Sequence, residues 1–205
     1  MNSNRSLRLV KFLALALLTA CFGGSLANAQ VAGGKKPVKM TFSGNGAASP
    51  INIKQPNTNT AEENVAGNGT LGRFTFRNVT AIAASPSPEP SSACSDPTHL
   101  YFPRVAGAGI FRFQDGSLLE VNLTQGGGGD CIDLVPPVEG HCTLTLQIMG
   151  GTGRFKDASG VLTYTETALP VLADASDNPI FFAETGKITG AVSGINEEQG
   201  QDEGQ

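Results

Sequence analysis

The alternation of apolar and polar residues is clearest over Cys142–Glu166, where it predicts two strands joined by a glycine-rich corner. From residue 142 to residue 148 every second position is apolar, and threonine or glutamine fills the positions between them. A period of two is typical of a strand with one buried face. Phe155 is the one large apolar residue of the corner, so we expect it to plug the core there. Three glycines give the corner its backbone freedom: Gly150, Gly151 and Gly153.

The same alternation predicts further strands along the chain, over residues 38–44, 72–83, 160–169 and 179–192. Within residues 105–124, Asp115-Gly116 separates two alternating runs, which is the strongest short signal for a hairpin. Two stretches lack the pattern. Residues 45–63 are polar and rich in turn formers, so we expect a long loop with room for one strand. Residues 125–130, which include four glycines, are expected to be a flexible connector.

Strands of this kind, separated by glycine and proline, are typical of an all-β barrel or sandwich. The chain has 26 glycines and no tryptophan, and no helical period stands out after residue 29. About 165 residues then remain, which is enough for one domain with a sizeable core. Residues 85–97 contain several prolines, so they cannot form a central strand and are expected to be a surface loop.

The first residues have the features of an export signal. Basic residues precede the apolar run Phe12–Ala20, which is too short to span a bilayer as a helix. Ala27-Asn28-Ala29 offers a small-residue cleavage site, so that residues 1–29 form a signal peptide and the mature chain begins at Gln30. Alternatively, residues 18–21 resemble a lipobox, in which Cys21 would be lipidated and anchor a lipoprotein. Either version predicts a secreted or periplasmic location.

Charge narrows the classes of partner. Removing residues 1–29 takes away three positive charges and no negative ones, so the formal charge changes from −4 to −7. Residues 196–205 carry four of the negative charges and no apolar residue, which predicts a disordered acidic tail after a domain over residues 30–195. Basic residues do not cluster, and no second long apolar run exists. We therefore expect neither nucleic-acid binding nor a transmembrane span.

Three cysteines remain after the signal: Cys94, Cys131 and Cys142. An exported protein meets oxidising conditions, so a disulfide is expected. Of the three pairings, Cys131–Cys142 is the most local. It would close a loop of about twelve residues and stabilise the fold by roughly 3 kcal/mol. Cys94 would then be unpaired or bonded to another molecule. His99 and His141 could join the cysteines in a metal site, but the spacing typical of zinc sites is missing, so no metal is predicted.

No catalytic or cofactor motif is recognisable. The glycine corner is not a phosphate-binding loop, because arginine and phenylalanine follow its last glycine and strands flank it. Asp130 with Asp133, and Glu166 with Glu184, could form carboxylate pairs for glycoside chemistry, but their spacing in the sequence does not place either pair at the required distance. We therefore predict no catalytic residue and no cofactor.

The corner also carries a resemblance. Residues 150–160, GGTGRFKDASG, are similar to the GGTGxFxxAxG segment of plant dirigent proteins and allene oxide cyclase-like barrels. They resemble still more a group of uncharacterised bacterial secreted proteins with a GGTGRF corner, and a looser likeness to that group extends over residues 101–190. The resemblance implies an eight-stranded antiparallel β-barrel. It implies little about a reaction, and no site residue of those families matches a position here.

These observations favour a non-catalytic barrel that holds a small apolar or aromatic ligand. Two alternatives stay open: a cyclase or isomerase that acts by confinement, as the resemblance could imply, and a structural envelope or surface protein that assembles, for example as a homo-oligomer. Five aromatic residues are expected to line the interior or its rim, with plain core packing as the alternative for each: Phe74, Phe76, Phe111, Phe113 and Tyr164.

Overall fold

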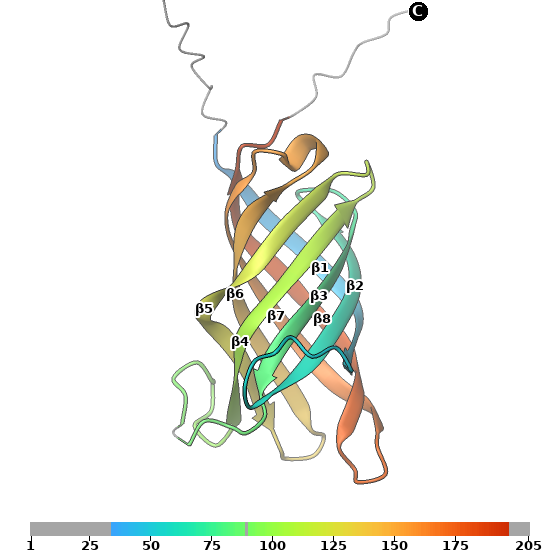
Figure 1. Cartoon of the computed structure of the whole chain (residues 1–205), viewed down its shortest axis with the longest axis vertical. Helices are drawn as coiled ribbons and strands as arrows, with labels where there is room; N and C mark the ends of the chain where they lie inside the picture. Colours follow the sequence, from blue (N-terminus) through green and yellow to red (C-terminus); the bar gives the residue numbers. More distant parts are fainter. Residues whose placement is uncertain (1–33, 89, 197–205) are drawn as a thin grey trace, which may run out of the picture. The chain divides into compact units, whose positions relative to one another are not determined.

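The computed structural model describes residues 34–88 and 90–196, and their strands form a closed antiparallel barrel (Figure 1). Each strand pairs with the next along the chain, and β1 pairs with β8 to close the sheet. The all-β class and the eight-stranded barrel are thereby confirmed. The predicted signal peptide, Cys21 and residues 197–205 lie outside the described residues. The strands are β1 Lys36–Ala48, β2 Thr58–Gly69, β3 Phe74–Ala83, β4 Leu100–Phe113, β5 Leu118–Asp133, β6 Glu139–Gly151, β7 Ser159–Ala173 and β8 Pro179–Ser193.

One end of the barrel is filled by apolar side chains. In β6 every second residue from Cys142 to Ile148 is buried, as the alternation predicted. The rings of Phe76 and Phe111 stack at this level with their centroids 4.1 Å apart. Phe155, from the short 3-10 helix Gly153–Phe155, is fully buried and closes the end as a plug. The packed end therefore has the filled interior that small barrels commonly have.

The corner that carries this plug depends on two different properties of glycine. Gly150 and Gly153 have φ angles of 127° and 57°, a region that other residues rarely adopt. Gly151 does not have a positive φ, which differs from the expectation that the whole corner needs unusual angles. Its constraint is space, because a Cβ atom there would clash with the carbonyl oxygen of Leu118 on β5.

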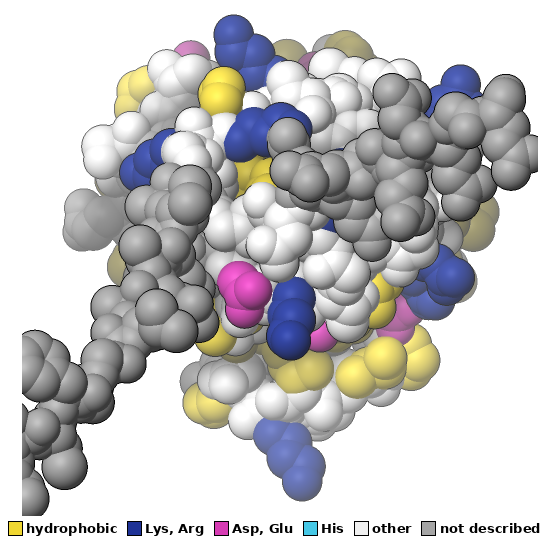
Figure 2. Space-filling view, turned by 90° about the horizontal axis from the view of Figure 1, so that it is seen from above, with side chains coloured by type: hydrophobic (Ala, Val, Ile, Leu, Met, Phe, Trp, Pro, Cys, Tyr) yellow, Lys and Arg dark blue, Asp and Glu magenta, His cyan; other side chains and the backbone are white. Residues whose placement is uncertain are grey.

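In the view onto this end of the barrel, Lys and Arg side chains are scattered rather than gathered in one patch (Figure 2).

Two stretches without alternation are strands, contrary to the sequence-based expectation. β1 extends to Ala48 and β2 starts at Thr58, so that the loop between them covers only residues 49–57. The glycine-rich segment 125–130 lies within β5, where the register with β6 shifts between Leu123 and Gly128. Glycine is suited to such a bulge, because the backbones of neighbouring strands approach closely there and leave no room for a side chain.

Candidate functional site

A cavity of about 560 Å³ opens at the barrel end opposite the glycine corner. It is formed where β1, β3, β5 and β7 end and where the other four strands begin. Its volume falls within the range of small-molecule sites, about 300–1,000 Å³. The large apolar side chains that line its walls include Ile82, Leu100, Phe102, Ile132, Ile180 and Phe182.

Below these apolar walls, five charged or ionisable side chains from different strands line the same cavity. We call them the charged cluster: Glu63 of β2, Arg104 of β4, Asp130 of β5, Glu166 of β7 and Glu184 of β8. All but Asp130 are at least nine-tenths buried, although such residues are almost never buried unless they are paired. The cluster therefore needs an account of the partner of each group.

Arg104 is the central partner. Its Nε and Nη2 donate to the two oxygens of Asp130 at 2.9 and 2.8 Å, in a bidentate pair. Its Nη1 donates to Oε1 of Glu63, and its Nη2 lies 3.6 Å from Oε1 of Glu166. Burial alone would lower the pKa of Arg104, but Asp130 and the other acidic groups raise it well above its usual value. The guanidinium is therefore a permanent positive charge inside the barrel.

Tyr164 connects the packed core to the cluster. Its ring stacks on Phe42 with centroids 4.7 Å apart, while its hydroxyl lies 2.6 Å from Oε2 of Glu166 and 3.0 Å from Oε2 of Glu63. A hydroxyl has one proton and can donate to only one of these oxygens. The contacts are satisfied together when Glu166 is protonated and donates to Tyr164, which then donates to Glu63. In agreement, burial and the charge of Glu63 raise the pKa of Glu166 well above its ordinary value.

Glu184 differs from the other acids of the cluster. Its side chain is 4% exposed, and its Oε2 has no hydrogen-bond partner among the described residues. Burial and then the charge of Glu63 raise the pKa of Glu184 from 4.5 to about 8. Glu63, in contrast, accepts from Asn78 at 2.7 Å in addition to Arg104 and Tyr164. Glu184 is thus a carboxyl group that lines the cavity and has one oxygen without a hydrogen-bond partner.

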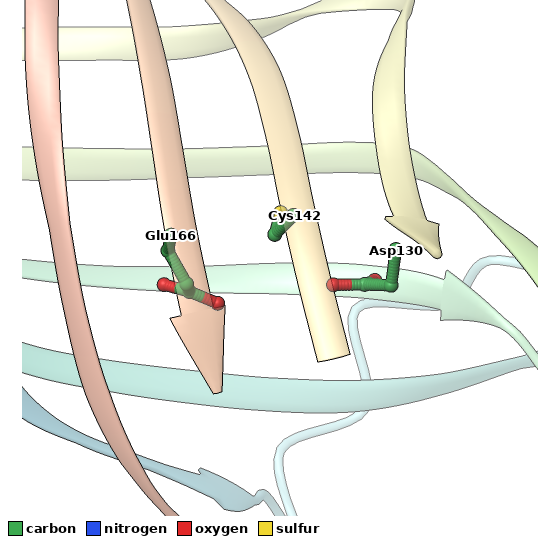
Figure 3. Close-up of side chains that lie close together, drawn as sticks. All are labelled: Asp130, Cys142 and Glu166. Carbon is green, nitrogen blue, oxygen red and sulfur yellow. The ribbon is translucent and has the colours of Figure 1, made fainter. Parts of the chain in front are cut away.

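Cys142 lies among these acids as a free and buried thiol. It is on β6, between β5 and β7, with the carboxyl groups of Asp130 and Glu166 on either side of it (Figure 3). Burial raises the pKa of Cys142 well above its usual value, so the sulfur keeps its proton. A thiol in this form is a weak nucleophile, because the thiolate is the reactive species.

Two groups of side chains have donor atoms within 4.8 Å of one another, as a metal site would require. They are Asp130 with Cys142 and Glu166, and Glu63 with Glu166 and Glu184. In the first group both oxygens of Asp130 accept from Arg104, and in the second both oxygens of Glu63 accept from Arg104, Asn78 or Tyr164. A metal ion would have to displace these donors, so we do not identify either group as a metal site.

The disulfide differs from the predicted pairing. Cys131 is bonded to Cys94 of the loop between β3 and β4, and Cys142 is free, so both the Cys131–Cys142 bond and an unpaired Cys94 were wrong. The pleat of the sheet explains the difference. Cys142 pairs with Asp130 and faces the interior, whereas Cys131 pairs with His141 and faces outward. Adjacent residues on a strand point to opposite faces, so proximity in the sequence did not bring these two sulfurs together.

All five aromatic residues that were predicted to line the interior or its rim lie in the packed core, which was the alternative considered for each of them. None of them lines the cavity, and only the hydroxyl of Tyr164 reaches the charged cluster. Of the carboxylate pairs considered, Glu166 and Glu184 both lie on the cavity, whereas Asp133 lies outside it, 3.9 Å from His99. Sequence reasoning missed Glu63 and Arg104. For Glu63 a signal was present, since it lies two residues before the buried Val65 and therefore on the same face of the strand.

Comparison with known proteins does not indicate a function, so a function has to be argued from the site. No protein-family model matches the chain, and no curated protein matches it significantly. The likeness to dirigent and allene oxide cyclase-like proteins therefore stays a prediction. In the part of the chain that the structure describes, no helix is long and apolar enough to cross a membrane.

Proposed function

We propose that this protein is an exported barrel that binds a small, mainly apolar molecule in the cavity at its open end and does not transform it. The observation that carries the proposal is the cavity of about 560 Å³ with apolar walls. Removing apolar ligand surface from water would drive binding, at about 25 cal/mol per Å². The disulfide between Cys94 and Cys131 and the predicted signal peptide support a location outside the cytosol.

The state of the charged cluster favours binding over catalysis. A general acid or base has to be free to exchange a proton with the substrate. Glu63, Asp130 and Arg104 are engaged with one another or with neighbouring side chains. Most of the charged cluster therefore acts as a fixed structural network.

A thermal-shift screen of lipids, terpenoids and aromatic acids tests the proposal. A ligand that binds only the native state raises the melting temperature by mass action, so we expect hits that mass spectrometry recovers unchanged. Ala61→Phe, which places a ring in the cavity, should abolish the shift, whereas Ala66→Phe on the exposed face of the same strand should leave it intact. Shifts that survive Ala61→Phe would show that the ligand binds elsewhere.

One observation favours an enzyme as the second candidate. Tyr164, Glu166 and Glu184 have raised pKa values beside the cavity, which is the arrangement of many acid–base sites. A cyclase or isomerase would convert a hit into product, and Glu166→Gln would abolish this conversion while leaving binding in place. The same mass-spectrometric analysis of the hits therefore separates the two candidates.

A further inference from the structure

The charged cluster has more acidic than basic groups, and this excess of negative charge restricts which ligand groups can bind beside it. The charged cluster contains four carboxyl groups and one basic group, Arg104. Arg104 compensates Glu63 and Asp130 only in part, since one positive charge faces two paired carboxylates. Even with Glu166 protonated, the net charge of the charged cluster remains negative. An anionic ligand group would therefore be repelled from it.

Glu184 supplies a second and independent indication of a ligand group. Its Oε2 is buried and has no hydrogen-bond partner among the described residues, and its side chain borders the cavity. A buried acceptor without a donor destabilises the protein, and more so when it is charged. A donor carried by the ligand would remove this cost.

We propose that the ligand has a protonated amine at one end of its apolar body and that Glu184 binds this ammonium group. The inference rests on the proposed binding function. An ammonium offers both the missing donor and the missing positive charge, and charge-assisted hydrogen bonds are about twice as strong as neutral ones. A hydroxyl would supply the donor without the charge, and a carboxylate or phosphate would add to the negative potential.

A divalent metal ion is a poorer fit at the same place. Such an ion needs several oxygen ligands, and the nearest set would be Glu63, Glu166 and Glu184. The oxygens of Glu63 already accept from Arg104, Asn78 and Tyr164, and Oε2 of Glu166 contacts Tyr164. An ammonium group requires only the one carboxylate that has no partner.

The inference also predicts that binding is coupled to a proton. Glu184 has its pKa raised to about 8, so the free protein holds a proton there at neutral pH, and the incoming ammonium replaces it. Affinity should therefore rise by up to about tenfold per pH unit between about pH 6 and pH 8, below the deprotonation of an alkylamine near pH 10. The titratable or charged groups that face Glu184 from the other strands are Glu63, Arg104, Asp130, Tyr164 and Glu166.

Two matched sets of probes test the inference in calorimetric titrations: 1-naphthylmethylamine, 1-naphthalenemethanol and 1-naphthoate, and decylamine, decanol and decanoate. Within a set only the head group changes. We expect the amine to bind at least about tenfold more tightly than the alcohol at about pH 7.5, and the acid to bind most weakly. Proton release should appear as a binding enthalpy that depends on the ionisation enthalpy of the buffer.

Variants connect the preference to one side chain. Glu184→Gln should bring the amine to the affinity of the alcohol and remove the pH dependence, whereas Glu120→Gln on the exposed face of β5 should change neither. Gly46→Ala is a second variant, because its methyl group would displace the end of the Glu184 side chain. It should lower the affinity of the amine more than that of the alcohol.

The possible outcomes separate this inference from the proposed function. If the alcohols or acids bind in a manner that Ala61→Phe blocks, and the amines bind no more tightly, the ammonium site is refuted and the binding function stands. If none of the six probes binds, the ammonium site is refuted, and the binding function is decided by the thermal-shift screen. If MgCl₂ or ZnCl₂ alone raises the melting temperature in a manner that depends on Glu184, and the amines do not, the site belongs to a metal ion and the inference fails.

Discussion

Replacing Glu184 by glutamine should make the stability of the protein less dependent on pH. In the native barrel the pKa of Glu184 is raised from 4.5 to about 8, chiefly by burial and by the charge of Glu63. The native state then holds a proton that the unfolded chain has already lost. The stabilisation by this proton is fully present below the unfolded-state pKa and is lost as the pH rises towards 8. Glutamine resembles the protonated acid and does not titrate.

The size of the effect follows from the window between the two pKa values. One proton bound only in the native state lowers the free energy of unfolding by about 1.4 kcal/mol for each pH unit. Between about pH 5.5 and pH 7.5, the wild type should therefore lose about 3 kcal/mol that the Glu184→Gln variant keeps. For a domain of this length, that difference corresponds to about 5–10 °C in melting temperature. Glu166 has a raised pKa of the same sign, so some pH dependence should persist in the variant.

The assay is urea denaturation at several pH values between about 5.5 and 7.5, followed by circular dichroism. Glu120→Gln, which removes a carboxyl group from the exposed face of β5, is the control and should keep the slope of the wild type. Parallel slopes for Glu184→Gln and the wild type would show that Glu184 is ionised in the native state. The account of an unpartnered, protonated acid in the cavity would then be wrong.

Two further predictions concern the frame of the barrel. Cys94→Ser opens the bond to Cys131, which spans a sequence separation of 37 residues, and should cost about 4 kcal/mol and lower the melting temperature by about 8–15 °C. Reduction of the disulfide in the wild type should lower the melting temperature by the same amount. A peptide map that links Cys131 to Cys142 would contradict this prediction. Gly151→Val should cost at least about 2 kcal/mol in urea denaturation, because the side chain would clash with the carbonyl of Leu118. A loss no larger than that of Gly116→Ala, a turn glycine with open space around it, would refute this reason.

The fold could be predicted where strands bury an apolar face on one side. β6 alternates without interruption from Cys142 to Ile148, and the predicted plug Phe155 is fully buried. The end of β1 beyond residue 44 and the start of β2 were missed because their inward positions include Gly46 and Glu63 instead of large apolar residues. Alternation of apolar and polar residues identifies a strand only where its inward side chains are apolar, so the prediction fails where the interior of the barrel is polar.

The site was harder to predict for the same reason. Glu166 and Glu184 were recognised as acids on late strands, but closure of the sheet brings them to Glu63 and Arg104, which are far away in the sequence. The number of strands alone does not say which side chains meet inside a barrel, because that also depends on how far each strand is shifted against the next. The bulges between β4 and β5 and between β5 and β6 add shifts that no turn signal announced.

The two ends of the barrel make opposite contributions to stability, and this division supports a binding role. The packed end buries apolar side chains around Phe76, Phe111 and Phe155, which favours folding. The other end buries acids whose desolvation opposes folding, since a buried ion pair seldom repays the loss of water. Replacing a buried charged cluster by well-packed apolar residues is often neutral or stabilising. The Oε2 atom of Glu184 in particular has no hydrogen-bond partner within the described residues, so a ligand that supplies a donor and a positive charge accounts for this buried acid better than a role in folding.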